Sequence, residues 1–181
     1  IITMCGIISL YKKKYRKSDF NFLDKTIEFL MKETELRGSD SSGIQINNSE
    51  RKEKYLIKRN IQSSKLIKEK NYKNYIKKAF DGDAGYRSVI GHCRMQTNGD
   101  TNSEYNNQPV HKQGTTCAHN GIITNIDELW DKKSQFNREY DIDSEILCDY
   151  FNTFVNKDVK ASKLLDMIYR DIYGETTFGV M

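Results

Sequence analysis

The sequence predicts an α+β fold in a single domain, and three observations support this. Short apolar runs rich in β-branched residues are typical of strands, and longer runs with apolar residues three and four positions apart are typical of amphipathic helices. The chain has 181 residues, 37% of them hydrophobic, which is enough to bury about two thirds of the unfolded surface in one core. No internal repeat and no linker rich in proline or serine marks a domain boundary.

The first half of the chain predicts two helical regions and three strands. Residues 5–11, CGIISLY, predict a strand that opens at Cys5. Residues 18–38 predict a helix over a sheet, ending at Gly38, with an inward face formed by Phe22, Leu23, Ile27, Leu30 and Met31. Short strands are expected at 44–47 and 55–59. The lysine-rich residues 63–80 predict a helical region with a solvated lysine face and an inward face formed by Leu66, Ile67, Ile76 and Phe80.

The second half predicts three strands and three helices. Strands at 88–97 and 114–124 flank a loop at 98–113, which holds the only proline, Pro109. Loops of this length are often functional. Helices are expected at 125–132, 143–155 and 162–172, the first two opened by Asn125 and Asp143. A last strand begins at residue 176, so helices are expected on both sides of the strands.

Charge and cysteine usage exclude several classes of function. Lys and Arg number 29 against 25 Asp and Glu, a formal net charge of +4, which is too weak a bias to indicate nucleic acid. No apolar run approaches the roughly 20 residues of a membrane span, and no signal peptide opens the chain. These features predict a cytoplasmic protein without a membrane partner. The cysteines show no C-x-x-C spacing, which favours free thiols.

A zinc site remains a conceivable alternative, built from His92, Cys93, Cys117 and His119. Residues alternate between faces along a strand, so His92 and Cys93 would point in opposite directions. We therefore expect no metal site here.

Five stretches carry a resemblance to a known family: MCGII, RGSDSSGI, GHCRMQTNG, AHNGIITN and DSEIL, in this order between residues 4 and 147. In this order they resemble the class II glutamine amidotransferases, and most of all the glutaminase domain of the glucosamine 6-phosphate synthase branch. The resemblance implies a four-layer αββα sandwich of the N-terminal-nucleophile hydrolase type over residues 1–181. It also implies that this domain is incomplete at its C-terminal end, and that residues 1–4 are absent from the mature protein.

The chemistry of Cys5 agrees with this resemblance. A thiol of pKa about 8.5 beside an α-amine of about 7.7 to 8.0 can supply both nucleophile and base when Cys is the first residue. The resemblance implies that Cys5 attacks the side-chain amide of L-glutamine, forms a γ-glutamyl thioester and releases ammonia, without a metal, nucleotide or flavin. The alternative is a buried and inert cysteine.

The resemblance assigns the other catalytic positions to Asn120 and Gly121. An Asn side-chain amide and a Gly backbone N–H suit an oxyanion hole, because glycine allows the backbone to approach the substrate closely. Taken alone, an Asn-Gly pair would indicate a tight hairpin turn.

Substrate recognition is expected from two charged residues and one loop. Arg94 resembles the arginine that binds the α-carboxylate of glutamine, with a surface salt bridge as the alternative. Asp143 matches the residue that receives the α-ammonium group, and it could also be a helix N-cap. Thr97, Asn98 and Gly99 stand where the family lines the pocket. Asn98 replaces a usual histidine, and Met95 and Gln96 replace Trp-Ala, so glutamine contacts and the final product could differ from those of the hexosamine branch.

The stretch RGSDSSG is interpreted as structural support. Arg37 and Asp40 are expected to form a buried, hydrogen-bonded corner behind Cys5, with Gly38 and Gly43 permitting turns. Ser41 and Ser42 would suit a serine hydrolase, but no G-x-S-x-G sequence accompanies them.

The predicted function is hydrolysis of L-glutamine to glutamate and ammonia, with the ammonia passed to an acceptor domain or subunit outside this chain. A sugar phosphate is one candidate acceptor, and an oligomer is compatible with the sequence. One alternative is an inactive relative that serves as a binding or regulatory module, because an acylated Cys5 has no free amine. Another is nucleic-acid binding through the basic residues 12–17 and 65–78 with their tyrosines.

Overall fold

The computed structural model describes residues 5–95, 104–155 and 159–181 of the chain. Its strands are β1 (Gly6–Lys12), β2 (Ser41–Asn48), β3 (Glu53–Arg59), β4 (Arg87–Arg94), β5 (Val110–Lys112), β6 (Thr115–Ile123) and β7 (Gly174–Val180). Its α-helices are α1 (Phe20–Glu35), α2 (Ser63–Leu66), α3 (Lys70–Ala79), α4 (Ile126–Lys132), α5 (Glu145–Val155) and α6 (Ala161–Asp171). Short 3₁₀ turns lie at Lys17–Asp19 and Glu104–Asn106.

The strands form two antiparallel sheets. The first sheet has the order β1-β4-β2-β3, and the second has the order β5-β6-β7. Strand β4 pairs with β1 on one side, where Cys93 lies opposite Gly6, and with β2 on the other, where Arg94 lies opposite Ser41. The start of β1 and the end of β4 are therefore neighbours, which brings Cys5 next to Arg94 and Met95.

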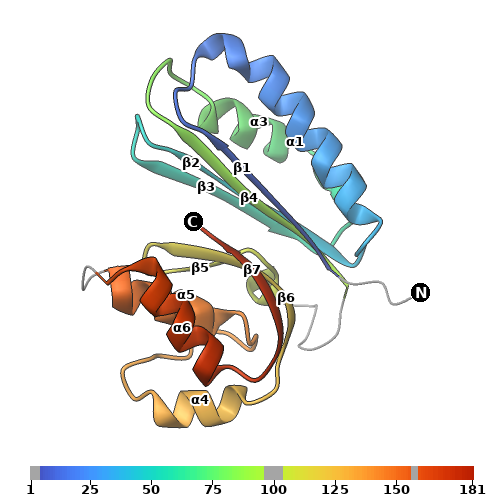
Figure 1. Ribbon diagram of the computed structural model, residues 1–181. Helices are drawn as coiled ribbons and strands as arrows, with labels where there is room; N and C mark the ends of the chain where they lie inside the picture. Colours follow the sequence, from blue (N-terminus) through green and yellow to red (C-terminus); the bar gives the residue numbers. More distant parts are fainter. Residues whose placement is uncertain (1–4, 96–103, 156–158) are drawn as a thin grey trace.

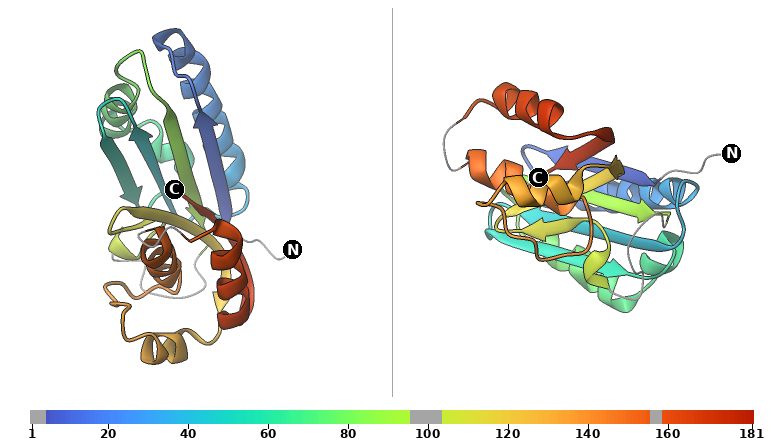
Figure 2. Two further views of the ribbon diagram at one scale, coloured as in Figure 1. Left: turned by 60° about the vertical axis from the view of Figure 1, so that its left-hand side comes forward. Right: turned by 90° about the horizontal axis from the view of Figure 1, so that it is seen from below.

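The two sheets stack face to face, with helices covering both outer faces. Helices α1 and α3 cover the first sheet, and α5 and α6 cover the second (Figure 1, Figure 2). This is the expected α+β fold, with the layer order αββα. No helix in the described part of the chain is long and apolar enough to cross a membrane.

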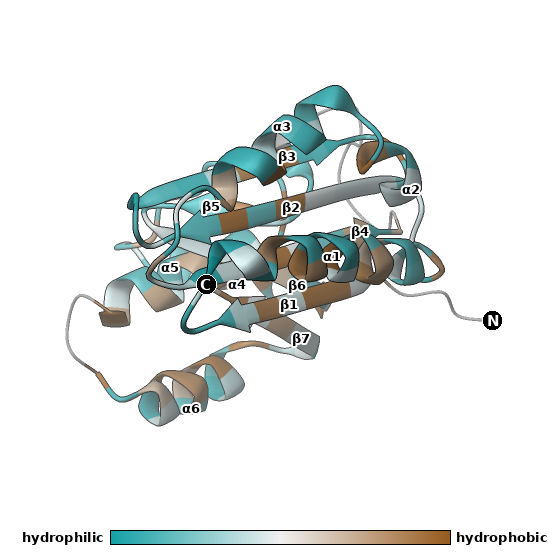
Figure 3. Cartoon of the chain, turned by 90° about the horizontal axis from the view of Figure 1, so that it is seen from above, coloured by the Kyte–Doolittle hydropathy of each residue, from teal (hydrophilic) through white to brown (hydrophobic). Residues whose placement is uncertain are grey.

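Each sheet packs against its helices through its own apolar core. The first core includes Leu23, Ile27 and Met31 of α1 together with apolar residues of β1, β2 and β4. Figure 3 shows α1 lying over this sheet, with hydrophobic stretches on the helix and on β1. The second core includes Ile146 and Leu147 of α5. Period-two alternation along β4 turns Cys93 towards α1 and leaves its neighbours His92 and Arg94 facing the second sheet.

Most predicted elements are confirmed, with a few corrections. Residues 63–80 form two helices, and the four residues expected to point inward are all buried. Phe22 was expected on the inward face but is 72% exposed. The expected loop at 98–113 contains the turn at Glu104–Asn106 and strand β5 in its described part. Asn125 precedes α4, but its side chain binds the backbone of Asp171 and Tyr173 instead of capping the helix.

The two tyrosines of the lysine-rich run are placed differently: Tyr75 is 40% exposed, whereas Tyr72 is buried. Tyr72 lies within the lysine-rich run but is buried in the first core, so it is not available to stack on a base. The lysines at positions 70, 73 and 77 are exposed, as expected for a solvated helix face.

Candidate active site

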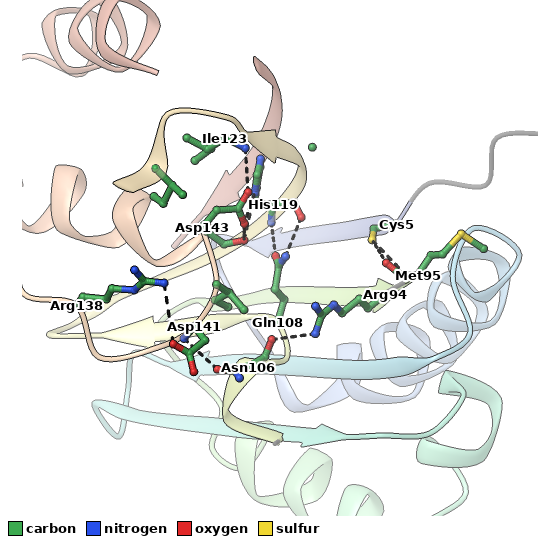
Figure 4. A pocket seen from close by; sticks show the side chains of 14 residues that line it. Cys5, Arg94, Met95, Asn106, Gln108, His119, Ile123, Arg138, Asp141 and Asp143 are labelled. Atoms are coloured by element: carbon green, nitrogen blue, oxygen red, sulfur yellow. Dashed lines mark hydrogen bonds and ion pairs between the residues drawn. The ribbon is translucent and has the colours of Figure 1, made fainter. Parts of the chain in front are cut away.

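A pocket opens between the two sheets at the end where β1 starts and β4 finishes. Its walls come from both sheets and from the segment that leads into α5, and they include Cys5, Arg94, His119, Gly121, Asp141 and Asp143 (Figure 4). The pocket thus joins four of the residues expected to act together: Cys5, Arg94, Gly121 and Asp143.

Cys5 immediately precedes β1 and is partly buried at the edge of the pocket. Its Sγ atom lies 3.2 Å from the backbone nitrogen of Met95 and 3.3 Å from the Met95 carbonyl oxygen. Burial raises the pKa of the Cys5 thiol, and the Met95 backbone and the charge of Arg94 offset part of that rise. Cys5 is therefore not fully buried, whereas the other three cysteines are.

Asn120 contacts the backbone of Cys5 from the second sheet. Its side-chain Nδ2 donates to the Cys5 carbonyl oxygen at 2.7 Å, and its Oδ1 lies 3.1 Å from the Nε2 of His92. Asn120 and Gly121 lie inside strand β6, so the interpretation of this pair as a hairpin turn is wrong.

Gly121 has a backbone conformation that only glycine adopts readily. Its φ is +136°, and a Cβ atom at this position would lie 1.8 Å from the carbonyl oxygen of Glu175 in β7. A side chain would therefore be strained and would push β7 away. Glycine at this position therefore allows β6 and β7 to pair closely where β6 lines the pocket.

Arg94 ends β4 and is only 6% exposed, so the surface salt-bridge alternative is wrong. Its Nη1 donates to the carbonyl oxygen of Asn106 at 3.2 Å and to Oδ1 of Asn107 at 3.3 Å. Both partners are neutral acceptors, and they help to hold the guanidinium at the pocket wall.

Asp143 faces the pocket from the segment before α5. Its Oδ2 accepts from the backbone N–H of Ile123 at 2.9 Å, and its Oδ1 lies 3.3 Å from the Ser144 hydroxyl and 3.7 Å from Nδ1 of His119. Burial alone would raise the pKa of Asp143, but the interactions with His119, Ile123 and Ser144 outweigh it and lower the pKa. The carboxylate therefore carries its charge at neutral pH.

Sequence reasoning missed the residues that fix these groups in position. The side chain of Gln108 accepts from the backbone N–H of His119 and donates to its carbonyl oxygen, which ties the loop before β5 to β6. Asn106, whose carbonyl oxygen accepts from Arg94, also accepts through its side-chain Oδ1 from the backbone N–H of Asp141 at 3.2 Å. Three side-chain amides in the sequence NNQP were the only available signal, since amides satisfy backbone groups in irregular loops.

The remaining predicted residues divide into three groups. Thr97, Asn98 and Gly99 lie outside the described residues, as does Gln96. Arg37 and Asp40 are exposed, so the expectation of a buried corner is wrong, although Arg37 Nε donates to the Cys5 carbonyl at 3.2 Å. Gly43 lies within β2 where the chain passes close to the carbonyl of Gln108, so it does not form a turn.

The side chains of His92 and Cys93 point to opposite faces of β4, as predicted for neighbouring residues on a strand. Cys93 lies in the first core, and His92 points away from it towards Asn120. Among the described residues, no group of three or more His, Cys, Asp or Glu side chains is arranged to hold a metal ion.

Comparison with known proteins shows one curated relative and several similar structures. The glutamine–fructose-6-phosphate aminotransferase (isomerizing) of Buchnera aphidicola subsp. Baizongia pistaciae is 34% identical over 183 residues, which cover 98% of this chain and 27% of that protein. The chain therefore spans about a quarter of the length of this relative. No protein-family model matches the sequence.

Two solved structures have the same fold. One is described as the allosteric regulatory enzyme of purine biosynthesis, with a TM-score of 0.63 and 17% identity. The other is the glutamine phosphoribosylpyrophosphate amidotransferase of B. subtilis, with a TM-score of 0.61 and 15% identity. Each match covers 98% of this chain and 35% of the other. The sequence match and the shared fold confirm the predicted resemblance to the class II glutamine amidotransferases and the expected N-terminal-nucleophile hydrolase fold.

Proposed function

We propose that this domain hydrolyses L-glutamine to glutamate and ammonia through a γ-glutamyl thioester on Cys5. The observation that carries the proposal is the convergence of Cys5, Arg94, Gly121 and Asp143 on one pocket, with Asn120 bound to the Cys5 backbone. The name of the curated relative, which is a glutamine-dependent aminotransferase, supports the same substrate.

In the first step, the Cys5 thiolate attacks the carbonyl carbon of the glutamine side chain. The α-amino group of Cys5 takes the thiol proton, because a free N-terminal amine has a pKa near that of the thiol. The negative charge that develops on the carbonyl oxygen is stabilised by the Asn120 amide and the Gly121 N–H. The carbon–nitrogen bond then breaks, the leaving nitrogen takes the proton, and ammonia departs.

In the second step, water attacks the thioester carbon. The same α-amine accepts a proton from the water, and the carbon–sulfur bond breaks to give glutamate and the free thiol. The oxyanion donors act again, since this intermediate carries the same charge. Both steps need a free amine, so we propose that the functional protein begins at Cys5, without residues 1–4.

Recognition of free glutamine is proposed to depend on the two fixed charges. Arg94 would bind the α-carboxylate and Asp143 the α-ammonium group, with Thr97, Asn98 and Gly99 completing the pocket. A glutamine inside a peptide lacks both charges, so it would form neither of these two ion pairs. We assign residues 1–181 to this one domain, of which residues 1–4 would be removed before activity.

The acceptor of ammonia is proposed to be a separate domain or subunit. The curated relative is named for fructose 6-phosphate, which makes a sugar phosphate the first acceptor to test. A cytoplasmic location is expected, since the cysteines are free thiols.

The direct test is glutamate formation from L-glutamine by protein whose intact mass shows Cys5 at the terminus. A matched form that retains Ile1 should form no glutamate and should not be labelled at Cys5 by a glutamine-like diazoketone. Equal labelling and turnover in the Ile1 form would contradict the N-terminal mechanism. No turnover in either form, with sugar-phosphate acceptors and the complete protein included, would favour the inactive binding module.

Substrate recognition is tested with two charge variants. Arg94→Lys should raise KM more than it lowers kcat, because lysine keeps the charge but loses the two-pronged geometry. Asp143→Asn should act in the same way through the ammonium group. Normal glutamine binding by both variants would show that the pocket assignment is wrong.

A further inference from the structure

The orientation of the Asn120 side chain is fixed by what it contacts. The Cys5 carbonyl oxygen can only accept a hydrogen bond, so the Asn120 atom 2.7 Å from it is the nitrogen of the amide. The amide oxygen then faces the other way, towards Nε2 of His92 at 3.1 Å. Because an oxygen can only accept, Nε2 of His92 has to carry a proton.

His92 is well suited to hold that proton in a fixed position. It lies near the end of β4, between its strand partners Ile7 and Gly43, and is only 1% exposed. Burial lowers the pKa of His92 to about 4, against the opposing effect of the Asn120 hydrogen bond. The ring is therefore neutral at physiological pH, with its single proton on Nε2.

We propose that His92 is a positioning residue for the glutaminase reaction: its Nε2–H holds the oxygen of Asn120 so that the amide N–H groups face Cys5 and the reacting carbonyl. This inference rests on the proposed function. One N–H of the Asn120 amide contacts the Cys5 carbonyl oxygen, and the second is available to the oxyanion. A reversed amide would present its oxygen to the developing negative charge, which would repel it.

The role differs from that of a base. The contacts of His92 Nε2 lead to Asn120, and Cys5 receives its hydrogen bonds from Met95, Asn120 and Arg37. A neutral ring with its proton committed to Asn120 acts through the amide it holds. Its effect is expected in the transition state, where the oxyanion exists, and not in the binding of glutamine.

The test compares two substitutions at His92 in protein processed to Cys5. His92→Leu removes the donor and keeps an apolar side chain in the buried site, whereas His92→Gln retains a side-chain N–H near the position of Nε2. We expect His92→Leu to lower kcat by up to about 100-fold with KM within about threefold of wild type, because the lost term is oxyanion stabilisation. His92→Gln should recover most of kcat. His111→Leu, on β5 outside the pocket lining, is the control and should keep wild-type kinetics.

A double-mutant cycle separates positioning from a merely structural role. If His92 acts through Asn120, then His92→Leu should add little to the loss caused by Asn120→Ala. Circular dichroism and urea unfolding establish that each variant is folded. Additive losses, or a failure of Gln to restore kcat in a folded protein, would overturn the inference.

The tautomer of His92 gives a readout that needs no turnover. In ¹⁵N-histidine spectra of the wild-type protein we expect the Nε2–H form at neutral pH, and an Nδ1–H form would overturn the inference. An inactive wild-type enzyme would defeat the proposed function. An active wild type with unchanged kcat in His92→Leu would defeat this inference alone.

Discussion

The Sγ atom of Cys5 lies 3.2 Å from the backbone nitrogen of Met95, although 90 residues separate the two in the sequence. The contact exists because β1 and β4 are antiparallel neighbours and Cys5 precedes β1 where Met95 follows β4. A backbone N–H that faces sulfur stabilises the thiolate, and the Met95 carbonyl 3.3 Å away accepts from the protonated thiol. The balance between thiol and thiolate at Cys5 therefore depends in part on the backbone that follows β4.

The first prediction concerns the pH dependence of Cys5 alkylation in protein that retains Met4. Burial raises the pKa of the thiol, so the iodoacetamide reaction rate should have its midpoint above the ordinary value of about 8.5. Arg94→Met should move the midpoint higher, because the guanidinium charge favours the thiolate. Intact-mass measurements between pH 6 and 10 give the rates.

Arg138→Met provides the control for that series, because Arg138 lines the pocket but is paired with Asp127 at 3.3 Å. It should leave the midpoint unchanged. The buried thiols of Cys93, Cys117 and Cys148 should not react in the folded protein. A midpoint below 8 in the wild type would contradict the prediction.

The second prediction is that Gly121→Ala destabilises the fold as well as the site. The positive φ and the 1.8 Å approach to the Glu175 carbonyl should together lower the free energy of unfolding by more than about 2 kcal/mol. Urea denaturation measures this loss.

Gly114→Ala separates the two causes. Gly114 has a φ of +103°, but a Cβ atom there would meet nothing within 4 Å. Its substitution should therefore cost only the backbone strain, about 1 kcal/mol. Equal losses in the two variants would mean that β7 moves freely away from Gly121.

The spacing of apolar residues predicted the helices and strands, because this spacing is a local property of each segment. The expectation for Phe22 failed since it precedes Leu23 by one residue and so lies about 100° around the helix from the buried line formed by Leu23, Ile27 and Met31. The apolar character of a residue does not by itself decide whether the sheet covers it when the apolar face of the helix is wide. Helix boundaries were correct to within a few residues for the same local reason.

The site was predictable only as a set of side-chain types. Cys5, Arg94 and Asp143 have chemistry that a motif reveals, and they do line one pocket. Their supports could not be predicted in detail, because the amides of NNQP do not reveal which groups they bind, such as Arg94 at the Asn106 carbonyl or the backbone of His119 at Gln108. Such contacts depend on how the two sheets meet.

The third prediction concerns a buried charged cluster beneath the pocket wall. Lys112 of β5 is fully buried, and its Nζ lies 2.6 Å from Glu145 and 2.8 Å from Asp149 of α5. The Glu145 carboxylate also accepts from the backbone N–H groups of Glu139 and Tyr140, at 2.8 and 2.9 Å. These contacts hold the segment that leads to Asp141 and Asp143.

Lys112→Met should lower the free energy of unfolding by about 3–5 kcal/mol, because it leaves two carboxylates buried without their cation. Lys132→Met removes an exposed partner of Glu128 and is the control, with little expected change. Urea denaturation of both variants checks the difference. A loss in Lys112→Met no larger than that in Lys132→Met would show that water or the neighbouring backbone compensates the carboxylates.

The fourth prediction concerns stability in acid. Burial raises the pKa of Asp143, but its interactions with His119, Ile123 and Ser144 lower it more, so the folded pKa is below the unfolded value near 3.9. The unfolded state therefore binds the proton more readily. The stabilising contribution of Asp143 is complete above pH 4 and is lost as the pH falls through the lower folded value.

Asp143→Asn removes this titration, so its free energy of unfolding should vary less steeply with pH below 4 than that of the wild type. The variant should also be less stable than the wild type at neutral pH, because the amide replaces a charged acceptor of the Ile123 N–H. Urea denaturation at a series of pH values between 2 and 7 gives both quantities. Asp131→Asn, an exposed change on α4 outside the pocket lining, is the control and should retain the wild-type slope. Equal slopes for wild type and Asp143→Asn would mean that the folded and unfolded carboxyl groups bind protons equally, and that the hydrogen bonds at Asp143 only compensate its burial.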